Sequence, residues 1–77
     1  MRIRFLYFEI KDENNKQNII NFLSKNRATK ITNLTFMFED DSSIEDLCNE
    51  LEESTNLGDK VIVLFQTEIG MVGRKIR

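Results

Sequence analysis

The chain opens with a segment, residues 2–10, in which apolar side chains occupy both alternating sets of positions. Its aromatic and branched residues favour an extended strand. Successive side chains of a strand point to opposite faces. One face therefore carries Ile3, Phe5 and Tyr7, and the other carries Leu6, Phe8 and Ile10. Because a strand that is apolar on both faces has to be covered on both, we expect this segment to lie centrally in a sheet.

A first helix follows, and we expect it to end near Asn26. Either Asp12 or Asn14 is placed to cap its N-terminus. Asn26 tolerates the left-handed conformation that ends many helices. The apolar positions follow helical spacing: Ile19, Ile20, Phe22 and Leu23.

A second helix starts after an acidic, serine-containing segment. Ser42 and Glu45 fit a capping box, and Asp40 and Asp41 also favour a helix N-terminus. The apolar positions recur at i, i+3, i+4 and i+7: Ile44, Leu47, Cys48 and Leu51. We interpret Cys48, which falls on this stripe, as a core thiol and not as a nucleophile.

The remaining segments are compatible with strands. In residues 34–39, Leu34, Phe36 and Phe38 share one face, and Thr35, Met37 and Glu39 share the other. Residues 60–66 form a continuous apolar run, which is typical of a central strand. Residues 28–33 suit a short edge strand, and the tail, residues 67–77, has the apolar residues for one more short strand. Gly58, in the loop before residue 60, is the expected position for a positive φ.

This order predicts an α+β fold: a ferredoxin-like βαββαβ sandwich with two helices on one face of a small antiparallel sheet. If residues 28–33 are not a strand, a three-stranded βαβαβ sheet remains as the alternative. Residues 1–77 make a single domain. A chain this short buries a modest core, and association is a natural source of further burial.

Two helices cannot cover both faces of such a sheet, so an apolar face is left over. We expect this face to pair with a second copy in a homodimer, with Phe5, Tyr7, Phe36 and Phe38 as candidate interface residues. A partner protein, single-stranded nucleic acid stacked on these aromatics, or the tail folding back are the other possible coverings.

Composition removes several kinds of chemistry. The chain has no His and a single Cys, which excludes zinc sites of the Cys/His type, His-dependent triads and an internal disulfide. This cysteine usage fits a reducing, cytoplasmic setting. No apolar run reaches the length of a membrane span, so we expect no membrane partner.

Charge is unevenly distributed, although the formal net charge is only −2. Residues 31–59 contain nine Asp/Glu and no Lys or Arg. The acidic surface expected there consists of Glu39, Asp40, Asp41, Glu45, Asp46, Glu50 and Glu53. The two ends of the chain are basic, and the candidate phosphate-binding residues are Arg2, Arg4, Arg74, Lys75 and Arg77.

Four segments together resemble a known group: Phe8-Glu9-Ile10, the strand from Leu34 to Phe38, the helix start from Asp40 to Ile44, and Gly58 to Val63. The chain resembles the small CRISPR-associated endoribonuclease-like proteins that serve as scaffolds in spacer integration, and their relatives of the virulence-associated protein D type. The resemblance implies a ferredoxin-like dimer whose sheets face each other. It also implies a metal-dependent nuclease site with an Asp at the end of the first strand.

Glu9 stands where that family usually has the Asp. We interpret Glu9 as a strand-end surface residue, with Mg²⁺ ligation as its alternative role, and we expect neither a metal nor a cofactor. The function expected is a non-catalytic binding or scaffold module, dimeric and in contact with nucleic acid through its basic ends. A phage-type inhibitor that docks a host protein complex through residues 39–53 is the first alternative, and a metal-dependent nuclease using Glu9 is the second.

Overall fold

The structure, a computed structural model, describes residues 2–76, and in this part of the chain it contains two helices and five strands. Their bounds, in chain order, are β1 (Ile3–Glu9), α1 (Glu13–Lys25), β2 (Thr29–Lys30), β3 (Thr35–Glu39), α2 (Ile44–Glu52), β4 (Lys60–Thr67) and β5 (Gly70–Lys75). Neither helix within these residues is long and apolar enough to cross a membrane.

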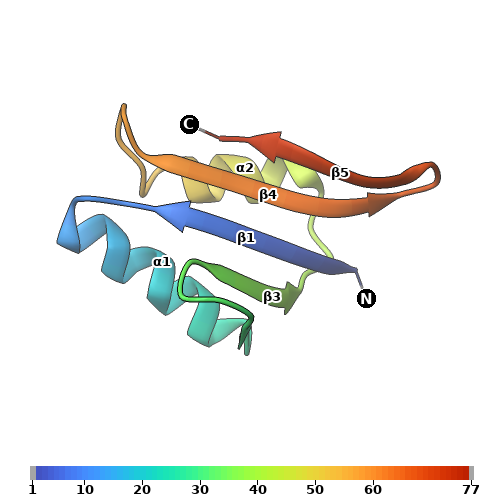
Figure 1. Cartoon of the computed structure of the whole chain (residues 1–77), viewed down its shortest axis with the longest axis horizontal. Coiled ribbons are helices and arrows are strands. Elements are labelled where there is room, and N and C mark those ends of the chain that lie inside the picture. Colours follow the sequence, from blue (N-terminus) through green and yellow to red (C-terminus); the bar gives the residue numbers. More distant parts are fainter. Residues whose placement is uncertain (1, 77) are drawn as a thin grey trace.

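The five strands form one antiparallel sheet in the order β2-β3-β1-β4-β5 (Figure 1). β1 lies in the middle and pairs with β3 on one side and β4 on the other, as its two-sided apolar pattern predicts. Of the expected edge strand, residues 28–33, only Thr29–Lys30 forms a strand, which pairs with β3 at one edge of the sheet. The three-stranded alternative is therefore wrong. The tail supplies β5 at the other edge, where it forms a hairpin with β4.

The α+β class is confirmed, with two helices and an antiparallel sheet. The count and order of strands differ from those of a simple βαββαβ sandwich, because β5 extends the sheet beyond β4. Lys60 to Thr67 is long enough to pair with β1 on one side and with the tail on the other. That length gives the additional strand its partner.

The core lies between the sheet and the helices. Both helices contribute to the same buried cluster, so both cover the same face of the sheet. The rings of Phe22 in α1 and Phe38 in β3 meet edge to face, with centroids 5.5 Å apart. The buried apolar residues of the described chain are Leu6, Phe8, Ile10, Ile19, Leu23, Phe38, Leu47, Cys48, Leu51, Val61 and Val63.

Cys48 is the core thiol that its helical spacing predicts, since only 5% of its surface is exposed. Burial raises the pKa of this thiol, although the positive charges of Arg74 and Arg4 act in the opposite direction. A buried thiol with a raised pKa has little of the reactive thiolate form.

α1 is capped by Asp12, whose side chain accepts a hydrogen bond from the backbone of Asn15 at 2.9 Å. The helix ends where expected, with Asn26 as its C-cap, but Asn26 has φ −93° and the left-handed residue is Arg27, with φ 54°. Asn26 instead continues the helical bonding, and both its backbone N–H and its side-chain amide donate to the carbonyl of Phe22. The chain therefore turns one residue later than predicted.

α2 is capped by Ser43, not by Ser42. The Ser43 hydroxyl oxygen accepts a hydrogen bond from the backbone of Asp46 at 3.1 Å. Ser42 is used differently: its hydroxyl donates to Asp40, and its carbonyl accepts a hydrogen bond from Arg4. The predicted box between Ser42 and Glu45 is thus wrong by one residue. Gly58 has the expected positive φ, 96°.

Candidate functional site

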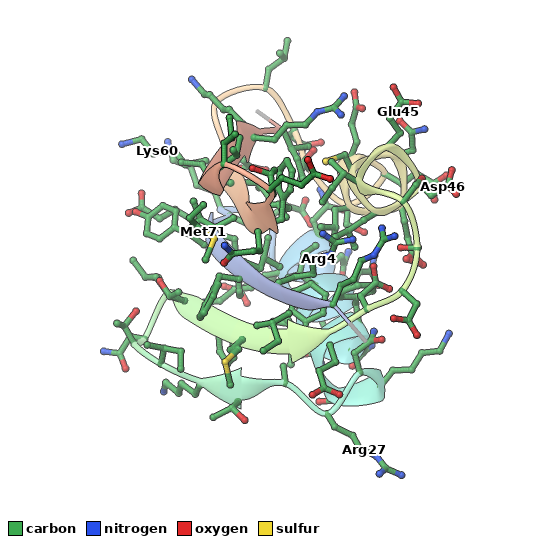
Figure 2. All side chains as sticks on the ribbon, turned by 90° about the vertical axis from the view of Figure 1, so that its right-hand side faces the viewer. Arg4, Arg27, Glu45, Asp46, Lys60 and Met71 are labelled. Carbon is green, nitrogen blue, oxygen red and sulfur yellow. The ribbon has the colours of Figure 1, made fainter. Side chains whose placement is uncertain are left out.

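The face of the sheet opposite the helices is the main candidate site, and we call it the open face. Among residues 2–76 no helix or strand lies over it. Figure 2 shows Met71 and Lys60 on this side of the sheet, while Arg4, Glu45 and Asp46 lie on the helix side. The open face is therefore formed by one alternating set of strand side chains.

The strand register brings apolar side chains together at the middle of the open face. Phe5 of β1 lies between Met37 of β3 and Leu64 of β4. In the next row, Tyr7 is paired with Ile62. All five side chains are only partly buried. Directly paired side chains on one face contact each other, so these five form a continuous patch, which we call the open-face cluster.

Two neighbours extend the open-face cluster. Ile3 and Met71 are 49% and 52% exposed and lie at the same end of it: Ile3 precedes Phe5 on one face of β1, and Met71 pairs with Gln66, next to Leu64 on that face of β4. Gly73 of β5 is paired with Leu64 of β4 and lies under the cluster. A Cβ atom added at Gly73 would lie 3.0 Å from the Leu64 side chain. The absence of a side chain at Gly73 lets Leu64 lie across β5. The open-face cluster thereby spans β3, β1 and β4 and reaches β5.

Glu9 lies at the end of the same row of β1 side chains. Its carboxylate accepts a short hydrogen bond from the Tyr7 hydroxyl. This bond, together with desolvation and the negative charge of Glu9, raises the pKa of Tyr7 above its usual value. The residue paired with Glu9 on β4 is Lys60, which is not a metal ligand of the usual kind. Within residues 2–76 no group of three or more Cys, Asp or Glu side chains is placed to hold a metal ion.

Two of the four predicted interface aromatics are not on the open face. Phe38 pairs with Arg4, and Phe36 pairs with Leu6, which places both on the helix side. Phe38 is 2% exposed, and Phe36 stacks on Phe8 with ring centroids 5.8 Å apart. Their prediction as interface residues is therefore wrong. Phe5 and Tyr7 do lie on the open face.

Arg4 is not a surface cation, so its predicted contact with phosphate is wrong for this structure. It is 2% exposed and shares the helix side with Leu6. Its Nη2 donates to the carbonyl of Ser42 at 2.9 Å, and its guanidinium carbon lies 5.9 Å from the ring centroid of Phe65. Its buried Nε has no hydrogen-bond partner. Arg4 instead links β1 to the segment that starts α2.

The other basic candidates do not gather on one surface. Arg2, Arg74 and Lys75 are exposed. Arg74 pairs with Val63 on the helix side, whereas Lys75 pairs with Ile62 on the open face. Arg77 lies outside the described residues. The sheet therefore separates the basic ends that the sequence groups together.

The predicted acidic residues follow the path of the chain from β3 to the end of α2. Glu39 ends β3, Asp40 and Asp41 precede α2, and Glu45 and Asp46 lie in its first turn, where Figure 2 shows them pointing away from the sheet. Glu50 and Glu53 line a shallow groove between α2 and α1. The acidic side chains thus gather around α2, except Glu39, which pairs with Ile3 and lies on the open face.

One pocket was not predicted from the sequence. It lies at the end of β1, and four of its lining residues are Lys11, Lys16, Lys30 and Lys60. We call it the lysine pocket. Its lysines come from separate parts of the chain, so a count of charge by segment does not reveal it. The sequence feature that could have revealed this pocket is the position of its lysines, because each lies at or near the end of a helix or strand.

The chain was compared with known proteins at three levels, and no protein-family model, curated protein or solved structure matches it.

Proposed function

We propose that this chain is a small non-catalytic binding or scaffold module that pairs with a second copy through the open face. The open-face cluster carries this proposal. Phe5, Tyr7, Met37, Ile62 and Leu64 form a continuous, partly exposed patch that no element of the described chain covers. Exposed apolar patches of this kind mark association surfaces in soluble proteins.

The proposed architecture is a ferredoxin-like sandwich with one additional edge strand. Its support is the order of the sheet, in which β1 lies between β3 and β4 and the short β2 lies beyond β3. The resemblance to the CRISPR-associated scaffold proteins supports the same arrangement of two sheets facing each other. In this proposal the two copies bury their open faces against one another, and β5 widens the surface available for pairing.

The size of the open face indicates a dimer of moderate strength. Five strands about 4.8 Å apart, with about six residues at about 3.3 Å each, give a flat footprint of roughly 480 Å². A standard interface buries about 800 Å² on each partner. We therefore expect a dimer of the small, transient class, which dissociates on dilution.

Substitutions on the open face test this proposal. Phe5→Lys introduces a charge at the centre of the open-face cluster and should give a monomer by light scattering after size exclusion. Ile69→Lys is the matched control, since Ile69 is 94% exposed in the turn between β4 and β5. It should leave the dimer intact. If both variants behave as the unmodified chain does, the open face is not the association surface.

Nucleic-acid contact through the basic ends stays a prediction for Arg2, Arg74 and Lys75, which are exposed. Arg4 is buried and no longer belongs to this set. Arg74 and Lys75 lie next to each other on the edge strand β5, with their side chains on opposite faces of the sheet.

The acidic α2 favours a second candidate function, docking to a basic protein as an inhibitor or regulator of phage type. The helix has no basic residue in its last turn, and Glu50 and Glu53 lie near its C-terminal end. Carboxylates at that end cost about 0.3–1 kcal/mol each, because they oppose the helix dipole. A partner that binds these carboxylates is a physical reason for keeping them.

Charge reversal separates this second candidate from the first. The triple variant Asp46→Lys, Glu50→Lys and Glu53→Lys should lose a basic protein that the unmodified chain retains from a host lysate. Glu68→Lys, an exposed acid in the turn between β4 and β5, is the control and should retain it. Retention by the triple variant would eliminate docking through α2.

A further inference from the structure

The end of the sheet where β1 finishes has features of a ligand site that the pairing of two sheets does not explain. β1 is antiparallel to both neighbours, so its C-terminal end lies beside the start of β3 and the start of β4. Figure 1 shows these segments and the start of α1 together at the left end of the sheet. The lysine pocket, of about 640 Å³, lies among them.

The lysine pocket carries excess positive charge. Its lining contains Lys11, Lys16, Lys30 and Lys60, and Glu9 is the one carboxylate among the lining residues. The buried Asp59 lies behind it. The lining residues carry four positive charges and one negative charge, in a protein whose net charge is −2, and Asp12 and Glu13 follow Lys11 directly in the chain. A concave site with this excess attracts an anionic ligand.

The floor of the lysine pocket is apolar. Phe8 and Phe36 stack with an interplanar angle of 24° and form part of its lining. Beside them Ile20 and Leu34 are 36% and 39% exposed. An inorganic anion would bind the ammonium groups and leave these side chains in water. A ligand that joins phosphate to a flat ring would use both parts of the pocket.

The walls of the lysine pocket are held in place by backbone contacts. Asp59 accepts hydrogen bonds from the backbone N–H groups of Lys11, at 3.3 Å, and of Asn56, at 2.8 Å. These bonds tie the loop before β4 to the end of β1. On the other side, the Phe8 N–H donates to the carbonyl of Leu34 at 3.0 Å. A ligand entering this pocket therefore meets a largely preformed site.

We propose that the lysine pocket binds a nucleoside phosphate. The lysine ammonium groups contact the phosphate oxygens as mobile point charges, and the base lies against Ile20 and Leu34. The pocket volume is in the range of about 300–1,000 Å³ typical of small-molecule sites. The same chemistry is supplied by a free nucleotide or by the 5′-phosphate end of a strand. The ligand is held within one chain, although two of the lining residues, Glu9 and Lys60, also lie on the open face that the proposed dimer uses.

Calorimetric titration of the full chain tests the proposal, with ATP, adenosine and inorganic tripolyphosphate as probes. ATP should bind more tightly than either adenosine or tripolyphosphate. The pair Lys30→Ala and Lys60→Ala should raise the Kd for ATP about fivefold per lysine, and added salt should do the same in the unmodified chain. Lys25→Ala with Lys75→Ala, two exposed lysines outside the lining, is the matched control and should leave the Kd unchanged.

A second variant tests the apolar floor. Leu34→Ser should weaken ATP binding and leave tripolyphosphate binding as it is. Comparison of 5′-phosphorylated and 5′-hydroxyl oligonucleotides identifies the source of the ligand: a preference for the phosphorylated strand over ATP indicates a strand end, and the reverse indicates a free nucleotide. The proposal is overturned if ATP does not bind, if the control pair weakens binding equally, or if tripolyphosphate binds as tightly as ATP.

Discussion

Two phenylalanines that occupy opposite faces of the sheet give the sharpest test of the packing. Phe38 is 2% exposed, and its ring contacts Phe22 edge to face. Phe5 is only partly buried on the open face. Truncating a buried Phe to Ala costs about 3–5 kcal/mol through lost burial and the cavity left behind. Phe5 is partly buried at the surface of the sheet and leaves no closed cavity, so its loss is that of its buried area alone, about 1–2.5 kcal/mol.

These magnitudes are large compared with the stability of so short a chain. At about 0.05–0.15 kcal/mol per residue, the whole free energy of unfolding is roughly 4–12 kcal/mol. With an m-value of about 1 kcal/mol/M, Phe38→Ala should lower the urea midpoint by about 3–5 M and Phe5→Ala by about 1–2.5 M. Circular dichroism through a urea titration measures both midpoints.

Protein concentration separates folding from pairing in this experiment. If the open face pairs two copies, the midpoint of the unmodified chain rises with protein concentration, and that of Phe5→Ala rises less. The loss caused by Phe38→Ala should persist at the lowest concentration. Equal losses for the two variants in dilute solution, or a greater loss for Phe5→Ala, would refute the assignment of the two faces.

Three further outcomes follow from single contacts. Ser43→Ala should cost about 1 kcal/mol of stability in thermal unfolding, and Ser42→Ala less, because Ser43 holds the cap of α2; the reverse order would return the cap to Ser42. Tyr7, the single tyrosine of the chain, should titrate by ultraviolet absorbance above its ordinary pKa, and Glu9→Gln should move it back. Because the folded pKa is the raised one, the associated stability is present below the ordinary tyrosine pKa and is lost as pH rises through the folded pKa; an unshifted titration contradicts the contact. Cys48 should react with a thiol reagent only at the rate of unfolding, and rapid labelling of the native chain would contradict its burial.

Periodicity predicted the elements of this fold better than their assembly. The two-sided pattern of residues 2–10 correctly placed β1 at the centre of the sheet. The same pattern states which side chains share a face of one strand, but not how that face lines up with the next strand. Pairing of Arg4 with Phe38 fixes this register, and it turns Phe36 and Phe38 towards the helices. Register depends on contacts distant in sequence, so the pattern of a single strand does not determine it.

The position of Arg4 was partly predictable. Its place in the alternation puts it on the same face as Leu6 and Phe8, which is the buried face. Its charge favoured an exposed, phosphate-binding position instead, since arginine is rarely buried without a partner. The compensating groups, the carbonyl of Ser42 and the ring of Phe65, lie far along the chain and become neighbours only in the folded sheet.

The lysine pocket likewise could not be predicted from the sequence, because its residues are distant from one another in the chain. Lys11 follows β1, Lys30 ends β2 and Lys60 begins β4, and no spacing in the sequence connects them. Antiparallel pairing around β1 brings them to one end of the sheet. The capping of α2 was missed by a single residue because Ser42 and Ser43 offer the same side-chain oxygen. In the folded chain the Ser42 carbonyl accepts a hydrogen bond from Arg4, and Ser43 takes the cap.

Pairing of two copies through the open face is tested most directly by nuclear magnetic resonance on a mixture of isotope-labelled and unlabelled chains. Contacts between copies, recorded as intermolecular nuclear Overhauser effects, should link the methyl groups of Met37, Ile62 and Leu64 with the ring of Phe5. They should disappear on dilution. Intermolecular contacts confined to α2 would contradict the account. So would NMR relaxation rates that remain those of a monomer at high protein concentration.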